Sequence, residues 1–327
     1  MFVNKSKIVI FFFCLLLISV CLIYILSNNN STSHPYYDFP SENNGWTKYG
    51  CEPVLGDSLT GTLFDPYVYL DGDSLIMLVS GRSTGTIIRY TSTDGIHWSN
   101  PITALEGIQG TWQNIVNRAC VLKKDSVWHM YYTGQFLDTS KIGHAISLDG
   151  YKFIADSLPV ISATTKLEGV SCMNPCVIYD NGGKYMMWYA AGENYEPDAL
   201  FYAESLDGLE WNKSESPVLK KYRRHKWECC KVGGCYVVND TTDQHPFTMY
   251  YIGYQTVHTA RICFATSDDG IVWNRDFDNL VLAPTMNSWD SNSTYKPSVL
   301  HFNGQRMMWY NGRTGHNEYI GLAIHHE

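Results

Sequence analysis

Thr91-Ser92-Thr93-Asp94-Gly95-Ile96-His97-Trp98 is the first of four versions of one phrase in this chain. Related phrases lie at 147–153, 205–211 and 267–273, each with an Asp-Gly pair followed by an aromatic residue. The aspartates are 55, 58 and 62 residues apart (149−94, 207−149 and 269−207). A period of this length, with strand-like sequence between the phrases, predicts a ring of repeated β-sheet modules.

Each phrase follows runs that are rich in β-branched and aromatic residues. In one module these runs are 175–179, 184–190 and 199–205. An Asp-Gly pair between β-rich runs favours a two-residue type I′ hairpin, which would lead into a fourth strand. Four strands are the content of one propeller blade. The second run of the module recurs in five places, which are 75–81, 129–134, 184–190, 248–253 and 306–312.

The fifth module is short, because the sequence at 321–327 matches only a third strand. Residues 44–55, near the other end, resemble 207–219. We therefore expect the N-terminal segment to supply the outer strand of the last blade, closing a five-bladed all-β propeller and removing its open sheet edge. A β-sandwich or an array of unrelated hairpins is the alternative, but neither typically carries such a repeat.

The composition suits one large all-β domain and argues against some partners. The chain has 327 residues, 45% of them hydrophobic, and a net charge of −8. With this charge and no basic stripe apparent, we predict no nucleic-acid partner. Eight of the ten cysteines lie outside the N-terminal apolar run, and Cys120 and Cys176, at equivalent strand positions, are expected to be buried thiols. An even number permits disulfides in an exported domain. No motif predicts a metal or another cofactor.

The N-terminus predicts a membrane anchor. Residues 8–26 form an uncharged apolar run of 19, preceded by Lys5 and Lys7. This length suffices for a transmembrane helix, and no A-x-A-like cleavage site follows. We expect a cytosolic stub at 1–7, a polar linker at 27–43 and the propeller at 44–327 on the extracytoplasmic side. Cleavage of the run as a signal peptide, giving a secreted protein, is the alternative.

The S-x-D-G-x-x-W turns, Met-Trp-Tyr second strands and x-P-x-V first strands resemble those of the five-bladed-propeller glycoside hydrolases. This superfamily includes arabinanases, β-xylosidases, invertases and mannoside phosphorylases. The resemblance extends from about Trp46 to the C-terminus. It implies a carbohydrate pocket at one end of the central axis, with carboxylates supplied by the innermost strands of successive blades.

The resemblance also implies site residues on the inner strands. Phe64-Asp65-Pro66-Tyr67-Val68 is similar to the superfamily's Asn-Asp-Pro or His-Asp-Pro element, which makes Asp65 a candidate base or nucleophile. Alternatively, Asp65 only caps a turn before Pro66. In the second module, Arg118 matches the arginine of the superfamily's Arg-Asp-Pro, but the acid after it is missing. In the third module, the superfamily has a Glu directly before the strand, whereas this chain has Met173-Asn174-Pro175-Cys176. Arg118 and Asn174 are candidate substrate-binding residues.

Other acids recur upstream of the inner strands. They are Glu168, Glu228 and Asp290, six residues before Asn174, Gly234 and Lys296 respectively. Trp112-Gln113 occupies the matching place in the second module. If the acids line the mouth of the axis, Glu228 or Glu168 is the proton donor, and Asp290 and Lys296 contact substrate. Alternatively, these positions belong to the repeat and are structural.

The leading hypothesis is therefore acid/base cleavage of a glycosidic bond in an oligo- or polysaccharide, which needs a proton donor and a second carboxylate. A glycoside phosphorylase is an alternative, with a cationic cluster for phosphate drawn from Arg118, Lys296, Arg313 and His316. The missing acids of the second and third modules favour a third hypothesis, a non-catalytic, membrane-tethered glycan-binding propeller.

Overall fold

The computed structural model describes residues 44–56, 62–180, 182–193, 197–275 and 278–326. The predicted stub at 1–7, anchor at 8–26 and linker at 27–43 lie outside the described residues. Within the described ranges, no helix has the length and apolar character needed to span a membrane. The one helical element there is a 3-10 turn, η1 (Lys226–Glu228), so the expected all-β class is confirmed.

The strands fall into repeats with the same internal order, from an inner strand to an outer strand. The first contains β2 (Leu63–Asp71), β3 (Ser74–Gly81), β4 (Thr86–Ser92) and β5 (Ile102–Leu105). The second contains β6 (Ile115–Lys124), β7 (Val127–Phe136), β8 (Thr139–Ser147) and β9 (Ile154–Ala155). The third contains β10 (Ser171–Tyr179), β11 (Tyr185–Gly192), β12 (Pro197–Ser205), β13 (Asn212–Lys213) and β14 (Leu219–Lys220).

The last two repeats follow the same plan. The fourth contains β15 (Lys231–Asn239), β16 (Phe247–Thr256), β17 (Thr259–Ser267) and β18 (Leu280–Leu282). The fifth contains β19 (Ser293–Phe302), β20 (Gln305–Thr314), β21 (Asn317–His325) and β1 (Trp46–Lys48). Neighbours within a repeat pair antiparallel, whereas a parallel pair, Ser171 with Ser140, joins the second and third repeats into one nine-stranded sheet.

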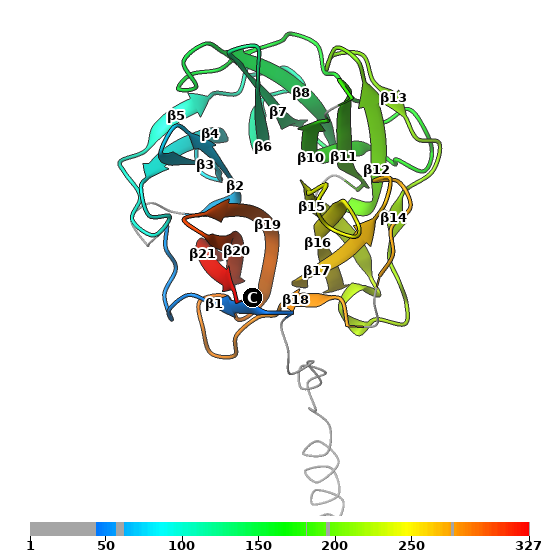
Figure 1. Ribbon diagram of the computed structural model, residues 1–327. Coiled ribbons are helices and arrows are strands. Elements are labelled where there is room, and N and C mark those ends of the chain that lie inside the picture. The colour runs from blue at the N-terminus through cyan, green and yellow to red at the C-terminus, as the bar shows by residue number, and fades with distance from the viewer. Residues whose placement is uncertain (1–43, 57–61, 181, 194–196, 276–277, 327) are drawn as a thin grey trace, which may run out of the picture. The chain divides into compact units, whose positions relative to one another are not determined.

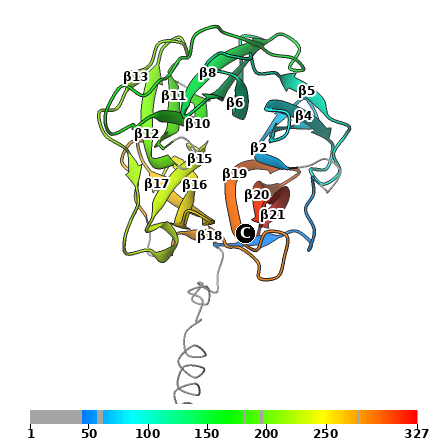
Figure 2. The same ribbon diagram turned by 180° about the vertical axis from the view of Figure 1, so that it is seen from behind.

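The inner strands surround a common centre. β2, β6, β10, β15 and β19 contact one another in this order, and β19 contacts β2 again (Figures 1 and 2). The N-terminal segment completes the last repeat, because β1 pairs with β21 and places Trp46 opposite His325. The Val54 N–H also donates to the Ile320 carbonyl at 2.8 Å. The predicted pairing of this segment is confirmed, and it covers an edge that would otherwise be open.

The Asp-Gly phrases do not form the predicted two-residue hairpins. A type I′ turn needs positive φ at both central residues, but in the third repeat only Gly208 has it, at 79°. Instead, the Ser205 hydroxyl accepts the Gly208 N–H at 2.9 Å, and the Asp207 carboxylate accepts the Leu209 N–H at 2.8 Å. Serine and aspartate side chains thus satisfy the backbone of a longer loop.

In three of the four phrases, the glycine contributes to contacts between repeats; they are Gly95, Gly208 and Gly270. Trp188 Nε1 donates to the Gly270 carbonyl of the next repeat at 2.7 Å, and Trp309 Nε1 donates to Gly95 at 2.8 Å. A Cβ atom on Gly270 would lie 2.8 Å from the Trp188 ring. These three turns therefore dock against the aromatic second strand of a neighbouring repeat, whereas Gly150 packs against Trp128 of its own repeat.

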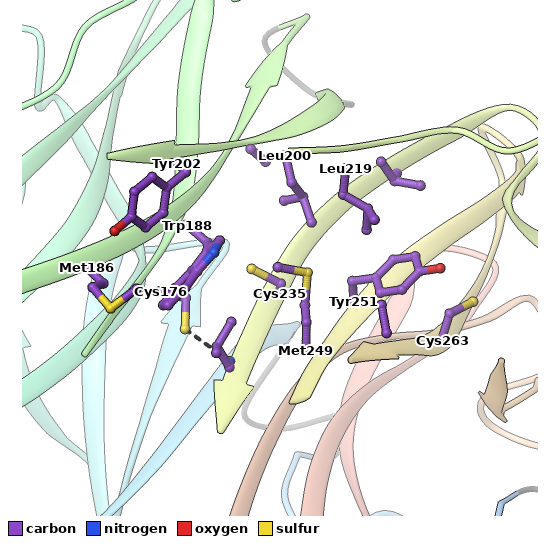
Figure 3. Packing of buried hydrophobic residues seen from close by; sticks show 14 of the residues in the cluster. Cys176, Met186, Trp188, Leu200, Tyr202, Leu219, Cys235, Met249, Tyr251 and Cys263 are labelled. Atoms are coloured by element: carbon purple, nitrogen blue, oxygen red, sulfur yellow. Dashed lines mark hydrogen bonds between the residues drawn. The ribbon is translucent and has the colours of Figure 1, made fainter. Parts of the chain in front are cut away.

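The core consists of side chains packed between adjacent sheets. Between the third and fourth repeats, Trp188 and Met186 face Met249 and Tyr251 (Figure 3). Burying each such large side chain contributes about 1.5–3 kcal/mol. Cys120 and Cys176 are buried free thiols, as expected, and no disulfide joins the eight cysteines of the described residues.

Candidate active site

A β-bulge interrupts every inner strand at the equivalent place. The pairing register shifts between Phe64 and Tyr67 in β2, and at the matching points of β6, β10, β15 and β19. Four bulged residues adopt a left-handed backbone conformation; they are Asp65, Arg118, Asn174 and Lys296, with φ of 56°, 57°, 55° and 48°. This conformation is uncommon outside glycine and persists where the surrounding structure enforces it.

Neighbouring repeats enforce this conformation. The Asp65 N–H donates to Asn311 Oδ1 at 2.7 Å, from the second strand of the fifth repeat. In the same way, the Arg118 N–H donates to Ser80 Oγ at 2.9 Å, and the Asn174 N–H donates to Thr133 Oγ1 at 3.0 Å. The bulges at Asp65, Arg118 and Asn174 are thus held by the preceding repeat. Bulges are known to re-aim side chains next to functional sites.

Three bulged side chains, Asp65, Arg118 and Asn174, line an axial pocket of about 180 Å³. The structure therefore brings together three residues predicted from sequence. Lys296 is also buried but does not line the pocket. The walls include Glu318 at the start of β21, which sequence reasoning missed. Comparing the repeats gives a signal for it.

Glu318 stands opposite Arg313 in the β20–β21 hairpin. The equivalent positions in the second and fourth repeats are occupied by Ser140 and Ala260, opposite Gln135 and Tyr254. An acid in only one of these repeats departs from the repeated pattern, and such a departure is typical of a functional rather than a structural position.

The two carboxylates of the pocket are buried, and each lies beside an arginine. Arg118 Nε lies 3.3 Å from Asp65 Oδ2, and Arg82 Nη2 lies 2.6 Å from Glu318 Oε2. The Tyr295 hydroxyl also donates to Glu318. Burial raises the pKa of Asp65 above its ordinary value, although the positive charges of Arg118 and Lys296 oppose this effect.

Two acceptor atoms at the pocket accept no hydrogen bond from the described residues, although one of them is the Asp65 oxygen that forms the ion pair with Arg118. They are Asp65 Oδ2 and Asn174 Oδ1, and both residues are 4% exposed. An unsatisfied buried acceptor costs about 1–3 kcal/mol, so native proteins rarely retain one without a reason. A ligand that donates hydrogen bonds would satisfy both atoms.

The three upstream acids do not line this pocket. Each is buried and accepts a hydrogen bond from a tyrosine on the second strand of its own repeat. The pairs are Glu168 with Tyr189 at 2.9 Å, Glu228 with Tyr251 at 2.6 Å, and Asp290 with Tyr310 at 3.2 Å. In the second repeat, the Tyr132 hydroxyl donates to Gln113 in the same way. The structure therefore favours the structural interpretation of these positions.

A basic residue neutralises each of these acids; it lies on the outer strand in the third and fifth repeats and just before the outer strand in the fourth. The ion pairs are Lys213 with Glu168 at 2.7 Å, Arg275 with Glu228 at 3.6 Å, and Lys48 with Asp290. In the second repeat, where the acid is Gln113, the equivalent outer-strand residue is Ala155. The acid and its basic partner are thus either both charged or both replaced by neutral residues, as expected of a buried ion pair.

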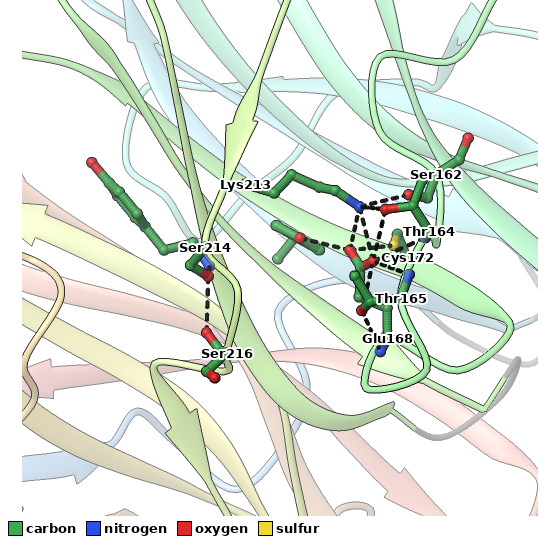
Figure 4. A network of polar contacts seen from close by, with 10 residues as sticks. Ser162, Thr164, Thr165, Glu168, Cys172, Lys213, Ser214 and Ser216 are labelled. Carbon is green, nitrogen blue, oxygen red and sulfur yellow. Dashed lines mark hydrogen bonds and ion pairs between the residues drawn. The ribbon is translucent and has the colours of Figure 1, made fainter.

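Figure 4 shows one of these sites, where Lys213 and Glu168 meet beside Thr164 and Thr165. Burial raises the pKa of Glu168, but hydrogen bonds from Lys213, the Thr164 N–H and Tyr189 outweigh it and lower the pKa to about 2. Glu168 is therefore ionised at neutral pH, which does not suit the proton donor expected from sequence. No group of residues with the makings of a metal site occurs in the part of the chain that the structure describes.

Comparison with known proteins identifies the relatives of this fold. Residues 89–250 match the family described as the glycosyl hydrolases family 32 N-terminal domain. The chain is thus similar, over just under half of its length, to a family of propeller glycoside hydrolases. The family match starts after Asp65 and ends before Glu318, so it includes neither pocket carboxylate of this propeller.

Other comparisons cover most of the propeller. An uncharacterized protein of Mycobacterium tuberculosis (strain ATCC 25618 / H37Rv) is 28% identical over 280 residues, which are 78% of this chain and 89% of that protein. A solved glycoside hydrolase superimposes with a TM-score of 0.70 at 17% identity, covering 86% of this chain and 91% of the other.

A third relative is a structure from the GH130 family of mannoside phosphorylases, a family that contains hydrolases of β-1,2 mannosidic linkages in Candida mannan. It superimposes with a TM-score of 0.67 at 15% identity, covering 88% of this chain and 95% of the other. Similarities at this level of identity establish the fold alone, because one fold hosts many reactions.

Proposed function

We propose that this chain is a five-bladed propeller, with its second and third repeats as separate blades, that cleaves a glycosidic bond of an oligo- or polysaccharide in the axial pocket. One observation carries the proposal: two buried carboxylates, Asp65 and Glu318, line the same pocket. The unsatisfied acceptors of Asp65 and Asn174 support a ligand rich in hydroxyl donors.

Glycosidic cleavage needs one carboxylic acid to protonate the leaving oxygen, and a second carboxylate to activate water or attack the sugar. The raised pKa of Asp65 suits the proton donor. Glu318 accepts hydrogen bonds from Arg82 and Tyr295, which suits the charged role. This assignment differs from the sequence-based one, in which Asp65 was the base or nucleophile and Glu168 or Glu228 the donor.

The size of the pocket supports a terminal sugar residue as the bound group. Its volume of about 180 Å³ lies below the roughly 300–1,000 Å³ typical of sites for drug-sized ligands. Arg118, Asn174 and Arg313 line it and supply polar groups for sugar hydroxyls. We propose Arg118 and Asn174 as substrate-binding residues, and Lys296 as a charge that tunes Asp65 from behind the pocket.

Phosphorolysis is the second candidate, because the pocket is rich in cations. Arg82, Arg118 and Arg313 line it, and Lys296 acts electrostatically on Asp65. A phosphorylase uses inorganic phosphate in place of water, so it needs a single proton donor and positive groups for the phosphate. His316 is exposed at the β20–β21 turn and does not line the pocket.

The test is a screen of aryl glycosides and oligosaccharides with and without inorganic phosphate. We expect Asp65→Asn and Glu318→Gln each to lower kcat/KM at least about 100-fold, the usual contribution of a general acid or base. Glu106→Gln, which changes an exposed acid outside the pocket, should be unaffected. Turnover only with phosphate would establish the phosphorylase. Glycan binding without product in either condition would establish the non-catalytic alternative.

We also propose that the propeller lies on the extracytoplasmic side, anchored by residues 8–26. The 19-residue apolar run preceded by two lysines supports this topology. Extraction of membranes with alkaline carbonate tests it, because an anchored chain stays with the membrane. Release of a chain that lacks its first residues would instead indicate a cleaved signal peptide.

A further inference from the structure

A basic loop stands out in this acidic protein. Residues 220–226 read Lys-Lys-Tyr-Arg-Arg-His-Lys, so five of seven are Lys or Arg in a chain of net charge −8. The expectation that no basic stripe occurs was therefore wrong for this segment. Four of its cations are exposed and have no ion-pair or side-chain hydrogen-bond partner among the described residues; they are Lys220, Lys221, Arg223 and Arg224.

The basic loop borders a cleft of its own. This cleft, which we call the basic cleft, has a volume of about 560 Å³ and lies between the β14 segment of the third repeat and residues 273–275 of the fourth. Lys220, Lys221 and Arg275 line it together with two aromatic side chains, Tyr222 and Trp273. Its volume falls within the roughly 300–1,000 Å³ typical of ligand sites. It shares no lining residue with the axial pocket.

The loop is anchored to the sheets beneath it. His225 Nδ1 lies 2.6 Å from the buried Glu228 carboxylate, and the Tyr222 N–H donates to the Glu228 carbonyl at 3.2 Å. Arg275 donates to the Lys220 carbonyl, and its guanidinium lies 5.7 Å from the Tyr222 ring. These contacts pre-organise the cleft, which reduces the entropy lost when a ligand binds.

We propose that the basic cleft binds an acidic polysaccharide, one that carries carboxylate groups along a chain of sugars. The exposed cations would pair with the carboxylates, and the arginines offer bidentate geometry for them. Tyr222 and Trp273 offer flat apolar faces for the C–H faces of sugar rings. The proposal rests on the proposed function, because the cleft would hold the polymer on which the axial pocket acts.

Charge elsewhere in the chain favours a glycan over a nucleic acid. Without the five cations of the basic loop, the remaining sequence carries a net charge of −13 (−8 − 5). This charge would repel a long duplex, with one charge per about 1.7 Å of its axis, more strongly than a polyuronate strand. A polyuronate strand is thinner, carries one charge per sugar and presents ring faces to aromatic side chains. The cleft offers cations for the charges and aromatic side chains for the ring faces.

The test compares polygalacturonate with its fully methyl-esterified form, which has the same backbone without charge, on the full-length chain. We expect polygalacturonate to bind at least tenfold more tightly. The Lys221→Ala/Arg224→Ala double variant should weaken its binding about three- to tenfold, since each exposed ion pair contributes modestly. Lys123→Ala/Lys152→Ala removes two exposed cations outside the cleft and should leave binding unchanged.

Three results would overturn the proposal. They are equal binding of the esterified polymer, an unaffected Lys221→Ala/Arg224→Ala variant, and tighter binding of a double-stranded oligonucleotide than of polygalacturonate. The Asp65→Asn variant separates this proposal from the proposed function. It should lose glycosidic cleavage and keep polygalacturonate binding, whereas a wild-type chain that binds the polymer and cleaves nothing would contradict only the enzymatic proposal.

Discussion

Replacing Glu168 by Gln should destabilise the protein measurably, although Glu168 does not line the axial pocket. The pKa of Glu168 falls from 4.5 to about 2 on folding, and each pKa unit corresponds to about 1.4 kcal/mol, so the limit is about 3 kcal/mol. Lys213 is 19% exposed, so solvent screens part of the interaction, and we expect about 1–3 kcal/mol.

The second repeat supplies the compensating change. Lys213→Ala alone leaves a buried carboxylate without its cation and should cost about 3 kcal/mol or more. The Glu168→Gln/Lys213→Ala double variant recreates the neutral pair of Gln113 and Ala155. It should therefore cost less than the sum of the single changes by about 1 kcal/mol or more, since residues in contact are not additive.

Urea denaturation of the full chain, followed by tryptophan fluorescence, measures these differences. The matched control is Glu204→Gln, which breaks an exposed pair with Lys184 at 2.8 Å and should cost less than about 1 kcal/mol. Because the folded pKa of Glu168 is lowered, its contribution is complete above pH 4.5 and disappears as pH falls towards 2. An additive double variant, or equal losses in Glu168→Gln and Glu204→Gln, would refute the reasoning.

Three further predictions concern the axial pocket and the turns. Asp65→Asn should raise the thermal midpoint of unfolding at neutral pH. The folded pKa of Asp65 is raised, so the wild-type protein loses stability as the pH rises through that pKa, whereas the neutral asparagine does not. A difference in thermal midpoint that shrinks as the pH rises would contradict this. Gly270→Ala, with a new Cβ 2.8 Å from Trp188, should cost about 1–3 kcal/mol. Gly110 has a φ similar to that of Gly270, but a Cβ atom there would have no neighbour within 4 Å, so Gly110→Ala measures the backbone strain alone. Equal losses of stability for the two variants in urea denaturation would argue against a packing clash with Trp188. Lys296→Met removes a charge that lowers the pKa of Asp65, so the alkaline limb of the kcat/KM profile should move to higher pH if Asp65 is the proton donor; an unmoved limb would exclude that role.

The repeat predicted most of the fold, because periodicity reports the packing that every module must satisfy. Pairing of the segment at 44–55 with the last repeat followed from a missing outer strand and was confirmed. The turn type was wrong, because the Asp-Gly signal was interpreted without Ser205, whose hydroxyl occupies the Gly208 N–H. Side-chain capping changed the loop without changing which strands it joins.

The site was less predictable, because the sequence gives no direct view of which side of a strand faces the axis. Asp65, Arg118 and Asn174 were found from the resemblance of their motifs to a known superfamily, and the bulges of the structure place them at equivalent points around the axis. For Glu168, the sequence left a catalytic and a structural role open, because its partner, Lys213, lies 45 residues further along the chain. Comparing Gln113 and Ala155 with these two positions would have revealed the pairing.

The two carboxylates of the axial pocket come from opposite ends of the propeller sequence. Asp65 lies on the first inner strand and Glu318 on the last hairpin, 253 residues later (318−65). During synthesis, the first acid leaves the ribosome long before the second exists. Nascent chains and fragments cut anywhere between them therefore lack a complete acid pair, so catalytic competence would report on the integrity of the whole polypeptide.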